Sequence, residues 1–113
     1  MVKFTILLRK RENLSHDEFV TYHKTKHAPL FNFLPEVQKY VRKYVQCHSL
    51  SVTLPGMPPP AYDGITELWF DDITDIGKVF TAERYMALIR PDEGKFLDLS
   101  GCGFLVSTET QQL

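Results

Sequence analysis

The chain has 113 residues, of which 43% are hydrophobic and 24% are charged, so its size and composition are typical of one globular domain, expected over residues 1–113. Thirteen Lys and Arg residues stand against 14 Asp and Glu residues, which gives a formal net charge of −1. This balance removes the electrostatic argument for binding to nucleic acid or to an anionic membrane. Eight Phe, five Tyr and one Trp are many large rings for so small a chain, and they indicate an aromatic core, subunit interface or apolar pocket.

The first predicted elements are a strand and a helix. Apolar residues recur at every second position over residues 2–9, which is typical of a β-strand. Ser15 and Glu18 have the spacing of a capping box, in which each side chain bonds the backbone N–H of the other residue at the start of a helix. The residue before Pro29 is disfavoured in helical backbone, so we expect this helix to end near His27.

Two further strands are predicted on either side of a proline-rich loop. Residues 38–50 alternate as a long strand, with the large side chains of Tyr40, Tyr44 and His48 on one face. The proline-rich segment that follows is incompatible with a helix or a central strand. Residues 62–70 then alternate as the third strand.

The last predicted elements are a helix, a less regular segment and a strand. Asp71 and Asp72 open the helix, and acidic residues are favourable in the first turn. Pro91 is expected to break any helix, with a short one over residues 92–97 after it. Residues 101–109 form the last predicted strand.

This order of elements predicts an α+β protein with a ferredoxin-like βαββαβ fold, in which two helices cover one face of an antiparallel sheet. The other sheet face then lacks a cover. Large side chains expected on uncovered strand faces are Leu7, Tyr40, Tyr44 and either Trp69 or Phe70. A second copy of the chain can bury them, so we expect a homodimer in which two sheets meet face to face and close a barrel.

Several common sequence signals are absent from the chain. No segment approaches the roughly 20 apolar residues of a membrane helix, and the apolar stretch near the start lacks the pattern of a signal peptide. Cys47 and Cys102 are too few for a disulfide framework, so we expect two buried thiols in a cytoplasmic protein. The sequence also lacks a P-loop, a GxGxxG or GxSxG motif and any spacing typical of metal ligands, so no metal site is predicted.

Five segments of the chain resemble the EthD family within the dimeric α+β barrel superfamily. In order, they are VKFTILLRKR, LSHDEFVTYHKTKHAPL, KYVRKYVQCHSL, YDGITELWFDD and RPDEGKFLD. The resemblance implies a small, mostly dimeric barrel with its ligand site between sheet and helices, and typically no metal or organic cofactor. Relatives include methylmuconolactone isomerases, proteins of polyketide and pigment pathways, and accessory proteins of oxidative degradation operons. The resemblance therefore indicates the fold and the site better than the reaction.

Two histidines are the candidate catalytic residues. His27 begins the motif HAPL, and the resemblance implies that this is the histidine position of the family. The negative end of a helix favours protonated imidazole whereas burial opposes it, and a group balanced near neutral pH suits proton transfer. The alternative is that His27 caps the helix carbonyls or packs under the next turn. His48 is the second candidate because it shares a strand face with Tyr44, and the alternative is a partly exposed residue near the strand end.

Six further residues are candidate substrate contacts: Tyr22, Tyr44, Tyr62, Glu67, Trp69 and Phe80. The three tyrosine hydroxyls can orient a carbonyl or a phenol, with simple packing as the alternative for each. Glu67 lies in mid-strand, where a carboxylate is costly unless it is paired. It is therefore a buried base with a raised pKa, an ion-pair partner of Arg9, Arg42 or Arg90, or an outward-facing residue. The Trp69 and Phe80 rings are expected in the core or the pocket wall.

The leading functional hypothesis is a cofactor-independent enzyme that acts on a small, apolar, oxygenated molecule of aromatic or polyketide-like type. The reaction is a lyase, dehydratase or isomerase step in which His27 moves a proton while a tyrosine and His48 hold an oxygen. Three alternatives stay open: a non-catalytic binding or accessory protein of an oxidative or biosynthetic pathway, a cofactor-free monooxygenase, and a haem-handling protein with His27 or His48 as the axial ligand.

Overall fold

The computed structural model describes all 113 residues and contains one four-stranded antiparallel sheet. Its strands are β1 (Val2–Leu8), β2 (Val41–His48), β3 (Gly64–Phe70) and β4 (Gly103–Ser107), in the spatial order β2-β3-β1-β4. β3 therefore lies between β1 and β2, the two strands that the first helical segment connects. This is the ferredoxin-like arrangement that the order of elements predicted, and the prediction is confirmed.

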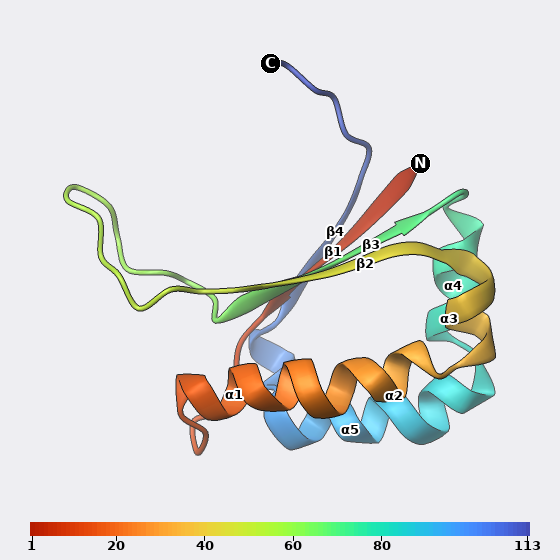
Figure 1. Ribbon diagram of the computed structural model, residues 1–113, viewed down its shortest axis with the longest axis horizontal. Helices are drawn as coiled ribbons and strands as arrows, with labels where there is room; N and C mark the ends of the chain where they lie inside the picture. Colours follow the sequence, from red (N-terminus) through yellow and green to blue (C-terminus); the bar gives the residue numbers. More distant parts are fainter.

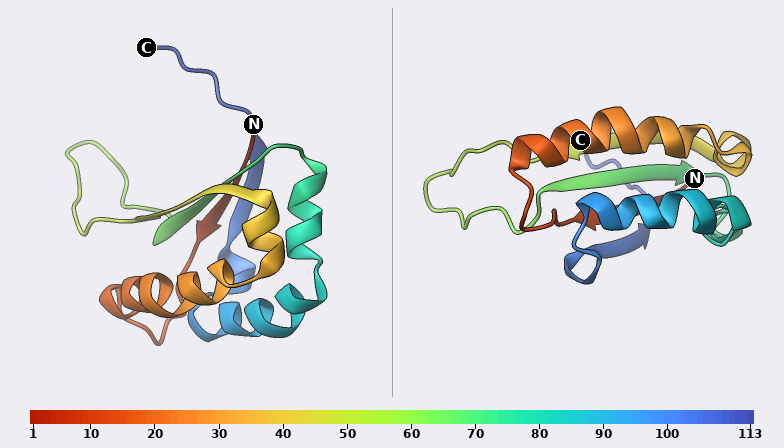
Figure 2. Two further views of the ribbon diagram at one scale, coloured as in Figure 1. Left: turned by 45° about the vertical axis from the view of Figure 1, so that its right-hand side comes forward. Right: turned by 90° about the horizontal axis from the view of Figure 1, so that it is seen from below.

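Two long helical segments cover one face of the sheet (Figure 1). The first comprises α1 (His16–Tyr22), η1 (His23–His27) and α2 (Ala28–Asn32), and the second comprises η2 (Tyr85–Ile89) and α5 (Arg90–Phe96). Figure 2 shows these segments side by side beneath the sheet, with α3 (Pro35–Tyr40) and α4 (Thr74–Phe80) at one end. A 3-10 turn, η3 (Leu99–Gly101), leads into β4. None of the helices has the length and apolar character needed to cross a membrane.

The predicted capping box starts α1. Ser15 Oγ accepts the Glu18 N–H at 3.1 Å, and Glu18 Oε1 accepts the Ser15 N–H at 2.9 Å. The buried Phe19 ring in the first turn packs against Phe96 of α5, with 6.0 Å between ring centroids. The local cap thus fixes where the helix begins, and the aromatic contact ties it to the second helical segment.

The helices continue through both prolines, so the expectation that they end there is wrong. In η1, the Ala28 N–H bonds the His23 carbonyl five residues earlier, which makes a π turn just before Pro29. η2 is a second π turn, and it precedes Pro91 in the same way. A proline ring in a regular helix clashes with the carbonyl four residues back, and the wider π turn relieves that clash. For the same reason residues 92–97 are part of a longer helix and not a separate short one.

The strand predicted for residues 38–50 is shorter because its first residues belong to α3. Pro35 occupies the first turn of α3, where its missing N–H has no helical partner to lose. The helix runs to Tyr40, and β2 begins at the next residue with an irregular register. Tyr40 therefore does not share a strand face with Tyr44, contrary to the expectation.

The two faces of the sheet differ in what covers them. The side facing the helices carries the buried Leu68 and Phe70 together with Tyr44. The opposite side, called the open face below, carries four partly exposed apolar side chains, Leu7, Val45, Ile65 and Trp69, and the exposed Leu105. Leu7 and Trp69 therefore lie on the uncovered face as expected. Tyr44 and Phe70 do not, because strand alternation turns them toward the helices.

Two hydrophobic clusters hold the helices on the sheet. The larger contains Phe31, Leu34, Val37, Leu68, Phe70, Val79, Tyr85 and Ile89, and the smaller contains Leu8, Phe19, Phe96 and Leu97. Side chains from both clusters line a cavity between the sheet and the helices. The core therefore consists of two parts, and the cavity between them is the candidate functional site.

The larger cluster predicts where truncation is most damaging. Leu34 is 1% exposed between α2 and α3, so Leu34→Ala is expected to lower the free energy of unfolding by about 2–5 kcal/mol through lost burial and a new void. Leu50→Ala is the matched control, because that side chain is 75% exposed, and its effect should stay within about 0.5 kcal/mol. Urea denaturation of both variants measures the difference, and equal losses would contradict the assignment of the core.

Candidate active site

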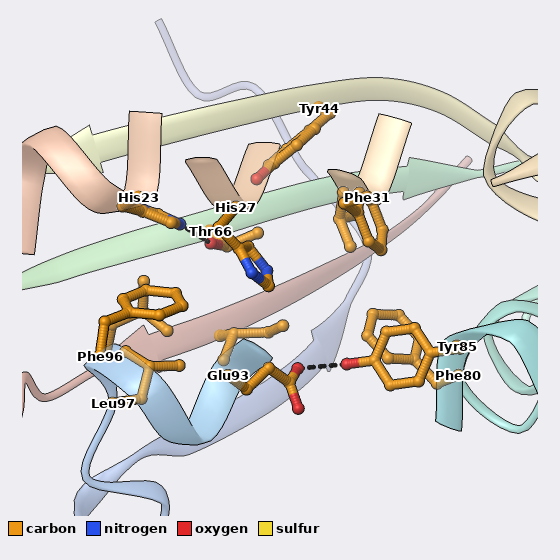
Figure 3. Close-up of a pocket in the computed structure, with 13 residues that line it drawn as sticks. His23, His27, Phe31, Tyr44, Thr66, Phe80, Tyr85, Glu93, Phe96 and Leu97 are labelled. Atoms are coloured by element: carbon orange, nitrogen blue, oxygen red, sulfur yellow. Dashed lines mark hydrogen bonds between the residues drawn. The ribbon is translucent and has the colours of Figure 1, made fainter. Parts of the chain in front are cut away.

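A small, partly open cavity lies between the sheet and the two long helical segments (Figure 3). Most of its walls are apolar, and the polar groups come from a few side chains. The lining residues most relevant to chemistry are His23, His27, Tyr44, Thr66, Tyr85 and Glu93. Apolar walls with a few converging polar groups are typical of a small-molecule site.

A buried carboxylate joins the two helical segments beside this cavity. Asp92 in α5 is 6% exposed, and its Oδ2 lies 2.8 Å from Nδ1 of His27 in η1. Its other oxygen accepts the Tyr22 hydroxyl proton at 2.5 Å. Burial, together with this carboxylate, raises the pKa of Tyr22 to about 12, so the phenol keeps its proton. Both Asp92 oxygens are therefore occupied by groups of the first helical segment.

The contact with Asp92 sets the orientation and tautomer of His27. An ionised carboxylate only accepts hydrogen bonds, so Nδ1 of His27 carries the proton that it donates to Asp92. In the neutral ring Nε2 is then unprotonated, and it has no hydrogen-bond partner in the protein. Figure 3 shows the His27 ring inside the cavity. The imidazole is thus held as a base toward the space in which a ligand would lie.

The helix dipole does not act on His27 in the way that the sequence predicted. His27 does not end a helix, because α2 continues to Asn32. The negative end of the helix is therefore more than one turn away, beyond the range over which the dipole acts strongly. The charge that faces the imidazole is the carboxylate of Asp92, which the sequence analysis did not identify.

His23 is the most buried histidine, with 1% exposure, and it also lines the cavity. Its Nδ1 lies 2.9 Å from Nε2 of His48, and its Nε2 lies 3.2 Å from the Thr66 hydroxyl oxygen. Gln46 donates to its backbone carbonyl at 2.9 Å. Burial, with a smaller effect of the nearby His27 and His48 rings, lowers the pKa of His23 to about 3. His23 is therefore neutral near physiological pH.

The second acidic group at the cavity is Glu93 in α5. It accepts the Tyr85 hydroxyl proton (Figure 3), and its other oxygen lies 2.9 Å from Arg90 Nε. Burial raises the pKa of Glu93, while Tyr85, Arg90 and His27 oppose that shift. On the sheet side of the cavity, burial raises the pKa of Tyr44 to about 12, so its hydroxyl stays protonated.

The structure brings some of the predicted site residues together. Three of them, His27, Tyr44 and Phe80, line the cavity directly. Tyr22 lies outside the lining and contacts the site through Asp92. His48 is also outside the lining and contacts it through His23, and burial, with Lys24 and His16, lowers the pKa of His48.

The other predicted contacts lie away from the cavity. Glu67 and Trp69 are on the open face, because they alternate with the helix-facing residues of β3. Glu67 pairs with Lys3, not with any of the three arginines considered, and the partners it gains lower its pKa. Tyr62 precedes β3 and has the Arg9 guanidinium 5.1 Å from its ring centroid. Strand alternation therefore directs Glu67 and Trp69 away from the cavity, and Tyr62 lies outside the strand.

Sequence reasoning missed four groups at the site: His23, Thr66, Asp92 and Glu93. One signal for these groups was available in the sequence. Both helical segments contain a proline next to polar residues, in HAP at 27–29 and in RPDE at 90–93. Pro91 was interpreted only as a helix breaker. Because both segments continue as helices and lie side by side (Figure 2), residues 65 positions apart come into contact.

The two cysteines lie far from each other and belong to no metal site. Cys47 is in β2 and Cys102 precedes β4, at opposite edges of the sheet, and both are free thiols. The expectation that both are buried is wrong, because Cys47 is exposed on the open face. No three His, Cys, Asp or Glu side chains converge in an arrangement that could hold a metal ion.

Comparison with known proteins connects this geometry to a family. A model of the EthD domain matches residues 11–100. A solved ethyl tert-butyl ether D (EthD) family protein from Bacillus halodurans is 19% identical, with a TM-score of 0.72, and the match covers 97% of this chain and 99% of that one. No curated protein matches the sequence.

Two other solved structures share the fold and are described as dimeric. A ferredoxin-like protein of unknown function from Bacteroides fragilis is 15% identical, with a TM-score of 0.65 and coverage of 94% of this chain and 93% of that one. A ferredoxin-like protein of unknown function from Thermobifida fusca is also 15% identical, with a TM-score of 0.66 and coverage of 96% and 90%. At such identities the likeness shows the fold.

The low pKa of His23 predicts an effect of pH on stability. The folded chain holds His23 neutral down to a pH of about 3, whereas an unfolded histidine gains its proton below about 6.5. Unfolding therefore takes up a proton between these values, and the stability due to neutral His23 is present above pH 6.5 and lost as pH falls. From pH 6 to 5, this residue should reduce the free energy of unfolding by about 1 kcal/mol.

Urea denaturation at several pH values, with wild type and His23→Gln, measures this contribution. The slope of stability against pH between 6 and 5 should be shallower in the variant by that amount. Measurements at pH 8, where His23 is neutral in both states, separate this effect from the general loss of packing in the variant. Parallel slopes for the two proteins would show that His23 is not held neutral.

Proposed function

The chain belongs to the EthD family, and from this premise we propose that it is a small-molecule enzyme that catalyses proton transfer without a metal or organic cofactor. The single observation that carries the proposal is the arrangement of Asp92 and His27. A buried carboxylate holds one nitrogen of the imidazole at 2.8 Å and leaves the other free in the cavity. This pairing makes the ring a base of defined orientation.

The cavity walls support a proposal for the class of substrate. Nine of the 13 lining residues are hydrophobic, which favours an apolar ring or chain. The Tyr44 and Thr66 hydroxyl groups lie on the sheet side and can donate hydrogen bonds to a carbonyl or phenol oxygen. We therefore propose an oxygenated aromatic or polyketide-like molecule as the substrate, in agreement with the expectation from the sequence.

The reaction begins with removal of a proton from a carbon next to a carbonyl. Nε2 of His27 takes the proton, and Asp92 stabilises the imidazolium that results. The negative charge that develops on the carbonyl oxygen is stabilised by the hydroxyl groups on the sheet side. Return of the proton to another carbon completes an isomerisation, whereas departure of a leaving group from the same enolate, with the proton passing from the imidazolium to that group, completes a lyase or dehydratase step.

The assembly that we propose is a homodimer formed through the open face of the sheet. Four of its apolar members, Leu7, Val45, Ile65 and Trp69, are partly exposed in one chain, and the fifth, Leu105, is exposed. Lys3 and Glu67 form an ion pair within the same face. Two similar solved structures are described as dimeric, and a twofold contact between open faces would bury these side chains.

The test of the proposed reaction uses deuterium exchange, because the natural substrate is unidentified. The purified protein is incubated in D₂O with a panel of aromatic lactones and cyclic β-diketones, and mass spectrometry measures deuterium bound to carbon. We expect catalysed exchange with members of the panel. His27→Gln should reduce the rate by about 10²–10⁴-fold, since the variant lacks the general base.

The matched control is His16→Gln, which makes the same change at a histidine that bonds the Ser49 carbonyl and does not line the cavity. This variant should exchange at the wild-type rate. Full activity in His27→Gln would rule out the mechanism. Tight binding of panel compounds with no exchange by the wild-type protein would instead support the alternative of a non-catalytic binding protein.

The dimer predicts a different effect for a charge placed on the open face. Ile65→Lys introduces a cation in a central strand of this face, so the variant should sediment as a monomer at a concentration at which the wild type is a dimer. Leu50→Lys is the control on an exposed loop residue and should remain dimeric. Analytical ultracentrifugation distinguishes the species, and a monomeric wild type would overturn the proposed assembly.

A further inference from the structure

A line of hydrogen-bonded side chains runs from the edge strand β2 to the cavity. It consists of His48, His23 and Thr66, with 2.9 Å between the two histidines and 3.2 Å between His23 and the hydroxyl oxygen. The proposed reaction at His27 does not use the first two of these groups. His23 and Thr66 line the cavity, and Figure 3 shows the bond between them close to the His27 ring.

His48, at the outer end of this line, reaches the protein surface at the edge of the sheet. His48 is partly exposed and lines a separate surface hollow together with Cys47, Tyr62 and Gly64. A Cβ atom on Gly64 would lie 2.8 Å from the Cys47 carbonyl oxygen and 3.5 Å from the His48 ring. The absence of a side chain at this residue therefore lets the imidazole lie close against β3. His48 thus contacts solvent on one side and the buried His23 on the other.

The position of His23 is fixed independently of its ring bonds. Its carbonyl is part of the π turn and accepts the Gln46 amide, whose nitrogen also lies 2.8 Å from the Tyr44 hydroxyl. The Phe19 ring stacks on the imidazole at 5.7 Å between centroids. The ring is therefore held in place while both of its nitrogens face groups that can either donate or accept a proton.

The hydrogen bonds among His48, His23 and Thr66 can form in two complete arrangements. In the first, His48 Nε2–H donates to His23 Nδ1, His23 Nε2–H donates to Thr66, and the threonine proton points into the cavity. In the second, Thr66 donates to His23 Nε2, and His23 Nδ1–H donates to His48 Nε2. Every ring is neutral and every buried nitrogen is paired in both, so neither arrangement leaves an unsatisfied group.

We propose that His48, His23 and Thr66 form a proton relay between the surface hollow and the cavity, and that Thr66 presents its hydroxyl proton to the oxygen of the bound substrate. The use of the delivered proton rests on the proposed function, whereas the relay itself is a property of the three side chains. His48 is accordingly a positioning and relay residue that acts through His23, and not the residue that contacts the substrate.

The proton balance of one delivery is as follows. A buffer acid or water gives a proton to Nδ1 of His48, and the Nε2 proton of His48 passes to Nδ1 of His23. The Nε2 proton of His23 passes to Thr66 Oγ1, whose own proton moves to the enolate oxygen and gives a neutral enol. Each histidine ends neutral with its proton on the other nitrogen, and the reverse sequence resets the relay when the enol returns to the ketone.

The test is ring-nitrogen NMR of the full-length protein labelled with ¹⁵N-histidine, near neutral pH and without ligand. In the wild type, both ring nitrogens of His23 should have shifts averaged between protonated and unprotonated values. Thr66→Val removes the partner of Nε2, so the proton should settle on Nδ1 and bond His48. His48→Leu removes the partner of Nδ1, so the proton should settle on Nε2 and bond Thr66.

Averaged shifts in the wild type together with opposite tautomers in the two variants are the expected result, because a merely structural pair would hold His23 in one tautomer in the wild type. His16→Gln is the control and should leave the wild-type average unchanged. One fixed tautomer of His23 in the wild type and in Thr66→Val would overturn the relay, even if His48→Leu failed to fold. Because no substrate is used, this result is independent of the deuterium-exchange assay, so the relay and the proposed reaction can fail separately.

Discussion

A carboxylate buried between two helices is the constraint on which the rest of the site depends. Asp92 is 6% exposed, and a charge in such a position is costly unless hydrogen bonds replace the lost water. Tyr22 and His27 supply those bonds, and both come from the other helical segment. The same contacts that solvate the carboxylate therefore hold the helices together and fix the free nitrogen of His27 in the cavity.

The two π turns make this contact compatible with the sequence. Pro29 and Pro91 would interrupt regular helices, and the first helix would then end at His27, where its dipole would act on the imidazole. Each π turn instead accommodates the proline ring without a clash, so both segments continue along the sheet. His27 consequently faces a full carboxylate charge from a neighbouring helix. π turns inside helices often occur at functional sites.

Local patterns in the sequence predicted the parts of the molecule that short-range interactions determine. The capping box of Ser15 and Glu18, the four strands and their order in the sheet all follow from spacing and topology. Tyr40 was misplaced because a short helix and a strand have similar apolar spacing over a few residues, and Pro35 was the signal for the helix. His27 was found through its motif. Asp92 and His23 were not, because their partners are distant in the sequence and pair only in the folded chain.

The role of Asp92 is the central claim, and exchange of carbon-bound hydrogen in D₂O by an Asp92→Asn variant tests it most directly. An amide of the same shape can donate to Nδ1 and thereby favour the opposite tautomer of His27, with its proton toward the cavity. The account predicts a rate at least about 100-fold below wild type, while Tyr22→Phe, which removes the other partner of Asp92, keeps most of the activity. A wild-type rate in Asp92→Asn would contradict the account, because the imidazole would then act as a base without the carboxylate.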